Sequence, residues 1–309
     1  MKTSKTTLNL IYSSLFFISI NVSADEIADK ISACNAALNK DELTSAITIS
    51  EAILKHAPNH HEGLLCKGRA LGAQNNYDAA LNTLEMAAKQ SKSGFDEILS
   101  HIFIGNLHKN NNKNMEAIAS YEKSIKICEV EKNDKFKRIN LNLIGETHIQ
   151  NNNLDAALAS YLTGSKLAMN DNERADSYER LASSYSALNQ HDLAIEYQLK
   201  AVLMQQKAGT LDDYADASYI LGQTYEKAKE YSNAERSYSK LLQFSKDNGG
   251  AYYEAKASYA LGKVKAITGN TENAKTILVE ALTIARNIGE TKLASEIETS
   301  LKVLSSQRR

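Results

Sequence analysis

The feature that most constrains this chain is a small residue followed twelve positions later by alanine, repeated in phase along most of its length. Six pairs share this spacing: Gly68 and Ala80, Gly105 and Ala117, Gly145 and Ala157, Ala182 and Ala194, Gly222 and Ala234, and Gly262 and Ala274. A weaker pair, Cys34 and Ala46, precedes them, and successive alanines are 34 to 40 residues apart. Self-similarity at such a period predicts a stacked repeat array, which offers an extended binding surface.

Each repeat contains a helix break between its small residue and its alanine. The breaks are rich in Asn or contain Gly, and they fall at residues 74–77, 110–114, 150–153, 189–192 and 269–272. Asn and Gly tolerate the left-handed backbone conformation that ends a helix. Small residues let two antiparallel helices approach closely. Each unit is therefore predicted to be a helix, a tight turn and a second helix.

This pattern resembles the tetratricopeptide repeat family, whose signature is W-x2-L-G-x2-Y…A-x3-F…P. The resemblance covers roughly residues 27–288, although the chain has no Trp and the closing proline occurs only as Pro58. The long spacings resemble the longer-helix variants of bacterial regulators and motor light chains, in which the second helix or its loop is extended. The resemblance implies an all-α, right-handed α-solenoid of about seven helix-turn-helix repeats. The units fall near 27–58, 61–94, 98–133, 138–171, 175–209, 215–248 and 255–288, followed by a cap helix at 290–305.

The N-terminus has the three parts of a secretory signal peptide. Lys2 and Lys5 precede an apolar run over residues 8–20, and residues 22–24 read Val-Ser-Ala, which fits a cleavage site. We predict a signal peptide at residues 1–24 and a repeat array over 25–309. The predicted location is periplasmic or secreted, and the alternatives are an uncleaved membrane anchor and a chance apolar start. No membrane span is expected after cleavage.

The chain has three cysteines, Cys34, Cys66 and Cys128, an odd count for a disulfide framework. The favoured interpretation is that they are small buried apolar residues, and the alternative is a bridge between Cys34 and Cys66. Residues 31–34 resemble a lipoprotein cleavage box, but charged residues separate them from the apolar run, so we do not expect lipidation. No metal and no cofactor are predicted.

The resemblance implies that the first helices line a concave groove. The residue after each small position is polar in all seven units. Three residues before the small positions of the last four units lie Asn142, Glu179, Tyr219 and Tyr259. The candidate groove residues are Arg69, Asn106, Asn142, Glu146, Glu179, Ser183, Tyr219, Gln223, Tyr259 and Lys263. The alternatives are a hydrated helix face and, for the two tyrosines, packing between helices. A family clamp for a C-terminal carboxylate is not expected, because Ile102 stands where that clamp needs lysine.

The favoured function is a non-catalytic scaffold or assembly factor of the bacterial envelope that binds a protein or peptide partner. The alternative is a ligand- or peptide-sensing module that changes curvature on binding. The net charge is −1, and −3 without residues 1–24, so nucleic acid is not an expected partner. The sequence contains no GxSxG, P-loop or HExxH motif, and an enzyme is not predicted.

Overall fold

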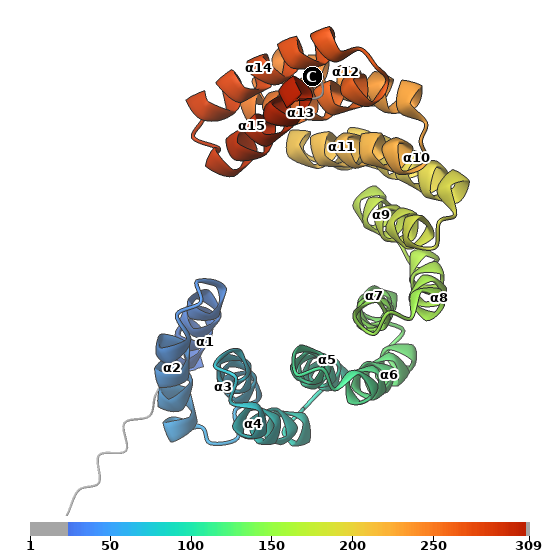
Figure 1. Ribbon diagram of the computed structural model, residues 1–309. Helices are drawn as coiled ribbons and strands as arrows, with labels where there is room; N and C mark the ends of the chain where they lie inside the picture. The colour runs from blue at the N-terminus through green and yellow to red at the C-terminus, as the bar shows by residue number, and fades with distance from the viewer. Residues whose placement is uncertain (1–23, 307–309) are drawn as a thin grey trace, which may run out of the picture. The chain divides into compact units, whose positions relative to one another are not determined.

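The computed structural model describes residues 24–306, which form fifteen α-helices and no strand within that range (Figure 1). The helices are α1 (Ala24–Asn39), α2 (Leu43–His56), α3 (His61–Ala73), α4 (Tyr77–Lys89), α5 (Gly94–Asn110), α6 (Asn114–Val130), α7 (Asp134–Gln150), α8 (Leu154–Ser165), α9 (Asp171–Ala187), α10 (His191–Ala208), α11 (Leu211–Lys227), α12 (Tyr231–Asn248), α13 (Ala251–Ile267), α14 (Thr271–Asn287) and α15 (Thr291–Ser306). Seven helix pairs and a terminal helix confirm the predicted all-α repeat solenoid.

The chain divides into two compact units, residues 1–90 and 91–309. The described part of the first unit contains α1 to α4, and the second unit contains α5 to α15. The predicted signal peptide lies almost wholly outside the described residues, because the description begins at residue 24. Among residues 24–306, no helix is both long enough and apolar enough to cross a bilayer.

The predicted turns are formed by residues with positive φ. Asn75, Asn112, Asn152 and Asn189 have φ between 55° and 62°. At the first of these turns, the Asn76 amide donates to the Leu71 carbonyl at 2.9 Å, and the Asn75 amide donates to the Gly72 carbonyl at 3.0 Å. These bonds satisfy two carbonyls at the helix end and reverse the chain direction. The Asn-rich breaks therefore end the first helix of four pairs, as predicted, and Asp41, Lys229 and Gly269 also have positive φ in the other three pairs.

The small residues lie where the two helices of a pair cross most closely. A Cβ atom added to Gly105 would lie 2.4 Å from Cε1 of Tyr121, which is itself fully buried. Gly145 and Gly222 face Tyr161 and Tyr238 in the same way, whereas Gly68 and Gly262 face leucines. The six repeat alanines from Ala80 to Ala274 are all fully buried. The five pairs with glycine at this position are thus packed around a backbone that leaves no room for a side chain.

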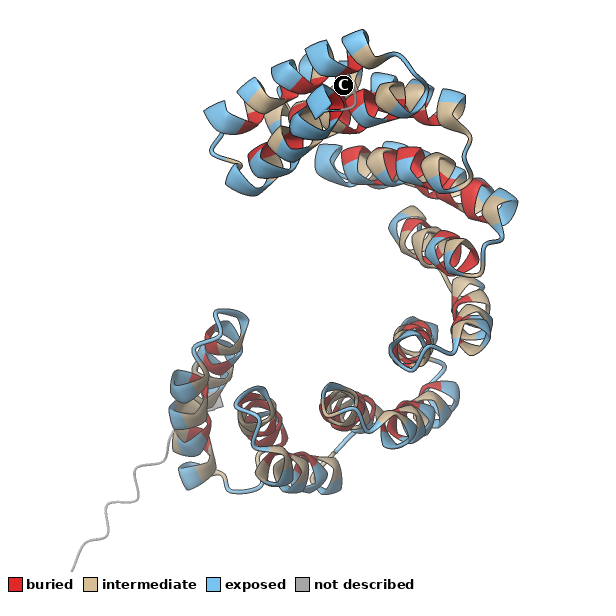
Figure 2. Ribbon diagram, viewed as in Figure 1, coloured by how far each residue is buried: buried red, intermediate tan, exposed pale blue. Residues whose placement is uncertain are grey.

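The long repeat period arises from both helices of a pair. The first helices α5, α7, α9, α11 and α13 each contain 17 residues, compared with 13 in α3. The second helices α6, α10, α12 and α14 contain 17 or 18 residues, compared with 13 in α4. The sequence pattern assigns the extra length to the second helix or its loop alone, and the lengthening of the first helix is a correction to it. The buried residues of each helix lie on the faces coloured red in Figure 2.

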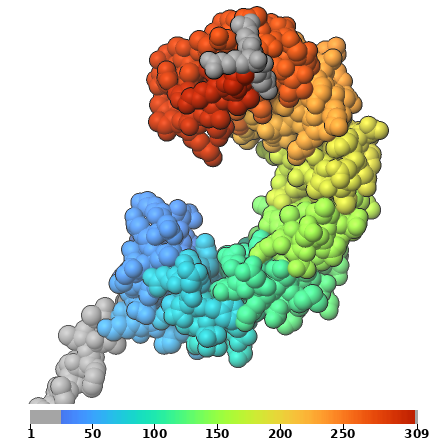
Figure 3. Space-filling model, viewed as in Figure 1, coloured from blue at the N-terminus to red at the C-terminus, as the bar shows by residue number. Residues whose placement is uncertain are grey.

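Packing is continuous along the second unit. Each helix from α5 to α15 contacts the next one along the chain, and the same contacts appear as touching surfaces from green to red in Figure 3. The terminal helix α15 covers α14 and α13 through buried Ala294, Ile297 and Leu304. Its other face is exposed, as expected for a helix that ends an array.

A disulfide joins Cys34 of α1 to Cys66 of α3, and their Cα atoms are 6.4 Å apart. The bridge therefore connects the two helix pairs of the first unit. The favoured interpretation of three unpaired buried cysteines was wrong for this pair, because the two helices lie side by side with their sulfur atoms within bonding reach. Cys128 remains a buried free thiol.

Candidate functional site

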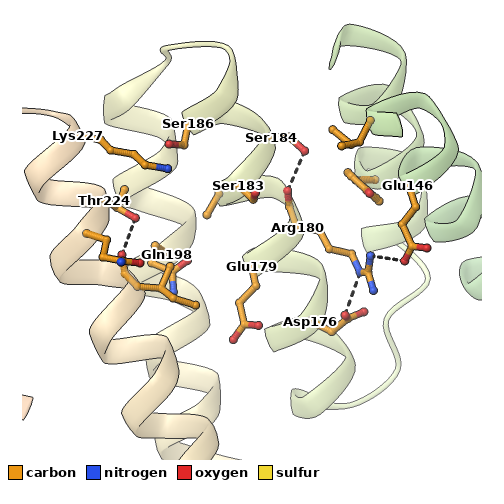
Figure 4. Close-up of a pocket in the computed structure, with 15 residues that line it drawn as sticks. Glu146, Asp176, Glu179, Arg180, Ser183, Ser184, Ser186, Gln198, Thr224 and Lys227 are labelled. Atoms are coloured by element: carbon orange, nitrogen blue, oxygen red, sulfur yellow. Dashed lines mark hydrogen bonds and ion pairs between the residues drawn. The ribbon is translucent and has the colours of Figure 1, made fainter. Parts of the chain in front are cut away.

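Two adjoining cavities lie in the second unit over the first helices α7, α9 and α11. Their volumes are about 520 Å³ and about 590 Å³, and both are lined by Glu179, Ile220 and Gln223. Because they share these residues, we treat them as one feature, the groove cleft. Figure 4 shows the larger set of lining residues, with side chains from neighbouring repeats converging on the opening.

A chain of ion pairs crosses three repeats at one side of the groove cleft. Glu146 of α7 accepts from Lys109 Nζ of α5 at 2.8 Å and from Arg180 Nη1 of α9 at 2.9 Å. Arg180 Nε also donates to Asp176 Oδ1 at 2.9 Å, so its guanidinium is held between two carboxylates (Figure 4). The Arg180 guanidinium also lies 5.7 Å from the ring centre of Tyr161. A planar guanidinium suits such a bridging position because it donates in several fixed directions.

The series of ion pairs continues to a buried arginine. Arg138 of α7 is 8% exposed, and its Nη1 donates to Asp176 Oδ2 at 2.9 Å. Its Nε lies 3.6 Å from Glu173 Oε2. Asn142 Nδ2 also donates to Asp176, at 3.3 Å. We call Lys109, Glu146, Arg180, Asp176 and Arg138 the charge ladder; it connects the first helices of three successive repeats.

The ion pairs of the charge ladder shift the pKa of Glu146 and that of Arg180. Burial raises the pKa of Glu146, but hydrogen bonding and charge from Lys109, together with Arg180, outweigh it and hold the pKa below its ordinary value. Burial lowers the pKa of Arg180, but the charges of Asp176 and Glu146 outweigh burial and hold this pKa above its ordinary value. Both groups therefore stay charged at neutral pH and neutralise one another.

Glu179 has a different environment. It accepts a hydrogen bond from Gln205 Nε2 at 3.2 Å, and among the described residues no cation forms an ion pair with it. Burial raises its pKa, and the neighbouring carboxylates Asp176, Asp213 and Asp216 raise it further. In Figure 4 its side chain points away from the Arg180 side chain. Glu179 is therefore a carboxyl group left without a compensating charge.

Lys256 and Tyr219 line the second cavity of the groove cleft. Lys256 Nζ lies 3.3 Å from Asp216 Oδ1 and 4.3 Å from the ring centre of Tyr219. Burial, followed by the charge of Glu226, raises the pKa of Tyr219 to about 12. The Tyr219 ring also packs 5.7 Å from the ring of Tyr238. Tyr219 therefore combines helix packing with a position at the cleft, which were the two alternatives for it.

The structure brings five of the ten candidate groove residues to the groove cleft: Glu146, Glu179, Ser183, Tyr219 and Gln223. The other five lie elsewhere. Arg69, in the first unit, donates to Asn35 at 2.9 Å. Asn106 accepts from Tyr121 Oη at 2.8 Å, and Asn142 is buried against Asp176.

The remaining two candidates are near α15. Tyr259 Oη lies 3.2 Å from Ser300 Oγ, and Lys263 Nζ lies 5.5 Å from the Tyr259 ring centre. Tyr259 belongs to the packing between α13, α14 and α15, so the interpretation as a helix contact describes it best. It does not line the groove cleft with Tyr219.

Sequence reasoning missed the charge ladder residues Arg180, Asp176 and Arg138, although two of them have a visible signal. Arg180 stands two residues before a small position, where the other units carry Ser32, Cys66, Phe103, Leu143, Ile220 and Ala260. Arg138 stands seven residues before a small position, where the other units carry Ile27, His61, Ile98, Ala175, Ala215 and Ala255. A charge at a position that is otherwise mostly apolar indicates a specific partner. Within residues 24–306, no three His, Cys, Asp or Glu side chains are arranged to hold a metal ion.

Stacked helix pairs with a cleft over their first helices define a helical-repeat protein of the α-solenoid class. The tetratricopeptide repeat model matches residues 99–130, 175–207, 215–248 and 255–288. These four segments therefore match tetratricopeptide repeats, in agreement with the resemblance seen in the sequence. No curated protein sequence matches the chain at a significant level.

Solved structures with the same fold cover most of the chain. The apo form of RapI has a TM-score of 0.66 at 15% identity, over 90% of this chain and 86% of RapI. Aspartyl phosphate phosphatase F from Bacillus subtilis has a TM-score of 0.59 at 13% identity, over 90% of this chain and 79% of the phosphatase. The apo quorum sensor NprR from B. thuringiensis has a TM-score of 0.55 at 15% identity, over 92% of this chain and 89% of NprR. At these identities the similarity establishes the fold alone.

Proposed function

We propose that this protein is a non-catalytic interaction module of the bacterial envelope that binds a segment of a partner protein in the groove cleft. The observation that carries the proposal is the cleft itself: side chains from neighbouring repeats converge there, and exposed Ile149 and Ile220 stand among polar groups. An apolar surface with a few convergent polar groups suits a bound peptide or helix.

The envelope location is supported by two independent features. Residues 1–24 have the pattern of a signal peptide, and Cys34 is bonded to Cys66. Disulfides persist mainly in oxidising compartments such as the periplasm. Cell fractionation with N-terminal sequencing of the purified protein tests this part. A cytosolic protein that retains Met1 would refute it.

Partner capture tests the binding part. The purified protein is immobilised beside Gln223→Lys, which places a long cation in both cavities, and exposed to an envelope extract of the source bacterium. Gln243→Lys is the matched control, because Gln243 is also exposed but lies on the second helix α12 and lines neither cavity. A protein retained by the wild type and by Gln243→Lys, but lost by Gln223→Lys, supports the proposal. Equal retention by all three places binding elsewhere.

A second candidate function is ligand sensing. NprR, which shares the fold, is described as a quorum sensor, and a signal transduction ATPase from Pyrococcus horikoshii contains a tetratricopeptide repeat sensor with a TM-score of 0.65 at 15% identity, over 88% of this chain and 44% of that one. A sensor requires a ligand that changes the repeat geometry. A rise in melting temperature with a small ligand, in the absence of a protein partner, would favour sensing over scaffolding.

A further inference from the structure

Among the described residues, most charged groups of the groove cleft have a charged or hydrogen-bonding partner, but Lys227 and Glu179 form no ion pair. Arg180 is neutralised by two carboxylates, Asp216 lies near Lys256, and Asp213 caps α11 by accepting from the Thr210 amide at 2.9 Å. Glu179 lines both cavities and has only the amide of Gln205 as a hydrogen-bond partner. A partly buried carboxylate without a cation is costly in the free protein, and a ligand cation would remove that cost.

The residues that line the groove cleft include more carboxylates than cations, so their formal charge is negative, as is that of Glu179. Five carboxylates line the two cavities: Glu146, Asp176, Glu179, Asp213 and Asp216. Three cations line them: Arg180, Lys227 and Lys256. Glu146 and Asp176 are also bonded to Lys109 and Arg138, which lie outside the lining. The uncompensated charge is therefore that of the second cavity, where Glu179, Asp213 and Asp216 face the single cation Lys256, a formal charge of −2. Complementary charge favours a positively charged ligand and disfavours an acidic one.

An independent feature of the groove cleft is its exposed apolar surface. Ile220 also lines both cavities and is 39% exposed, while Ile149 lines the first cavity and is 41% exposed. Ile220 directly follows Tyr219, whose ring lies at the second cavity. Large apolar side chains exposed inside a cleft gain free energy when a ligand covers them. An inorganic cation would leave this surface uncovered.

We propose that the groove cleft takes an extended segment of a partner protein that carries a Lys or Arg side chain beside a large apolar one. The cation bonds to Glu179, and the neighbouring apolar side chain covers Ile220. Ser183 and Gln223 are exposed at the same surface, and their polar groups suit the main chain of the segment. This inference rests on the proposed function and adds the chemistry of the bound segment to it.

Selection from a phage-displayed library of random dodecapeptides tests the inference, because such a library offers the groove cleft every side-chain chemistry at once. The purified protein, Glu179→Lys, Glu280→Lys and Gln223→Lys are used as targets. Glu280 is exposed on α14 and lines neither cavity, so Glu280→Lys makes the same charge change away from the groove cleft. We expect the wild type and Glu280→Lys to enrich Lys or Arg next to Leu, Ile, Met or Phe, and Glu179→Lys to lose this preference.

A synthetic peptide of the enriched sequence then gives the size of the effect. Replacing Glu179 by Gln keeps its shape and removes its charge, and we expect the dissociation constant to rise on the order of ten- to one-hundredfold, as for loss of a charged hydrogen bond. Circular dichroism verifies that each variant is folded.

The outcomes separate the inference from the function on which it rests. Enriched peptides without a basic residue, or a preference that Glu179→Lys leaves unchanged, would refute the inference and leave peptide binding in place. If the wild type enriches no peptide above the level of Gln223→Lys, both the inference and the proposed binding groove are refuted.

Discussion

The bridge between Cys34 and Cys66 should contribute a large share of the stability of the first unit. The two cysteines are 32 positions apart, and closing a loop of that length lowers the entropy of the unfolded chain by an amount equivalent to about 4 kcal/mol at 25 °C. That free energy corresponds to a several-hundredfold change in the equilibrium between the folded and the unfolded first unit. Since marginal domains have about 5 to 15 kcal/mol in total, the bridge is a substantial fraction.

Hydrogen exchange of the oxidised and reduced wild-type protein measures this contribution with no change of side chain. Both sulfur atoms are buried, so the protein is reduced in denaturant and refolded with the reductant present. We expect amide protection in α1, α2 and α3 to fall by up to several hundredfold and protection in α5 to α15 to stay the same. The first unit holds the bridge, whereas Cys128 of the second unit is a thiol in both states.

Two controls make this prediction refutable. Thiol titration of the denatured, unreduced protein should find one free thiol, and three thiols would mean that the bridge is absent. A protein with the bridge intact whose α1 to α3 amides exchange at equal rates in the oxidised and reduced states would refute the entropic argument. Cys128→Ala should leave the difference between the two states unchanged.

Three further changes test the packing and the charges of the second unit. Gly105→Ala should destabilise it by about 1 to 3 kcal/mol in urea unfolding, because the new methyl group meets Tyr121, whereas Gly250→Ala, whose nearest contact would be 3.7 Å, should be nearly neutral. Arg138→Met should cost about 1.5 to 3 kcal/mol, since it leaves Glu173 without its cation and removes one of the two cations bonded to Asp176. A neutral effect would mean that Arg138 adds nothing to the charge ladder. Glu179→Gln should stabilise the protein at neutral pH. Burial raises the pKa of Glu179 in the folded state, so ionisation of this carboxyl group opposes folding as the pH rises through that pKa. The gain in stability from the substitution should vanish below the pKa of Glu179 in the unfolded state.

The repeat architecture was predictable because each of its causes is local and repeated. A small residue at Gly105 allows close helix approach, and Asn112 takes the left-handed conformation that ends α5. Both signals recur at one spacing, so chance agreement is averaged out over seven units. The extra turn in the first helices was missed because nothing at the small positions marks where those helices begin.

The candidate site was predictable only in part, because its contacts are made between repeats. Position in a repeat identified Glu179 and Gln223 as groove residues, but it gave no partner for either side chain. The bond between Arg180 and Glu146 joins residues 34 positions apart, and it depends on side-chain directions that a single sequence does not contain. The pairing of Cys34 with Cys66 is of the same kind, since it depends on how α1 lies against α3.

The charge ladder explains why one carboxylate in the groove cleft can determine which segment binds. Arg180 contacts Glu146 and Asp176 at 2.9 Å, so a bound segment would have to replace good hydrogen bonds to use any of these three groups. Pairs of this kind hold the first helices in place, and a ligand that replaced their hydrogen bonds with its own would gain little free energy. Glu179 has no such partner to lose, and its neighbours repel a second negative charge. The discrimination between a basic and an acidic segment is therefore concentrated at Glu179, on helices whose relative positions the ladder has already set.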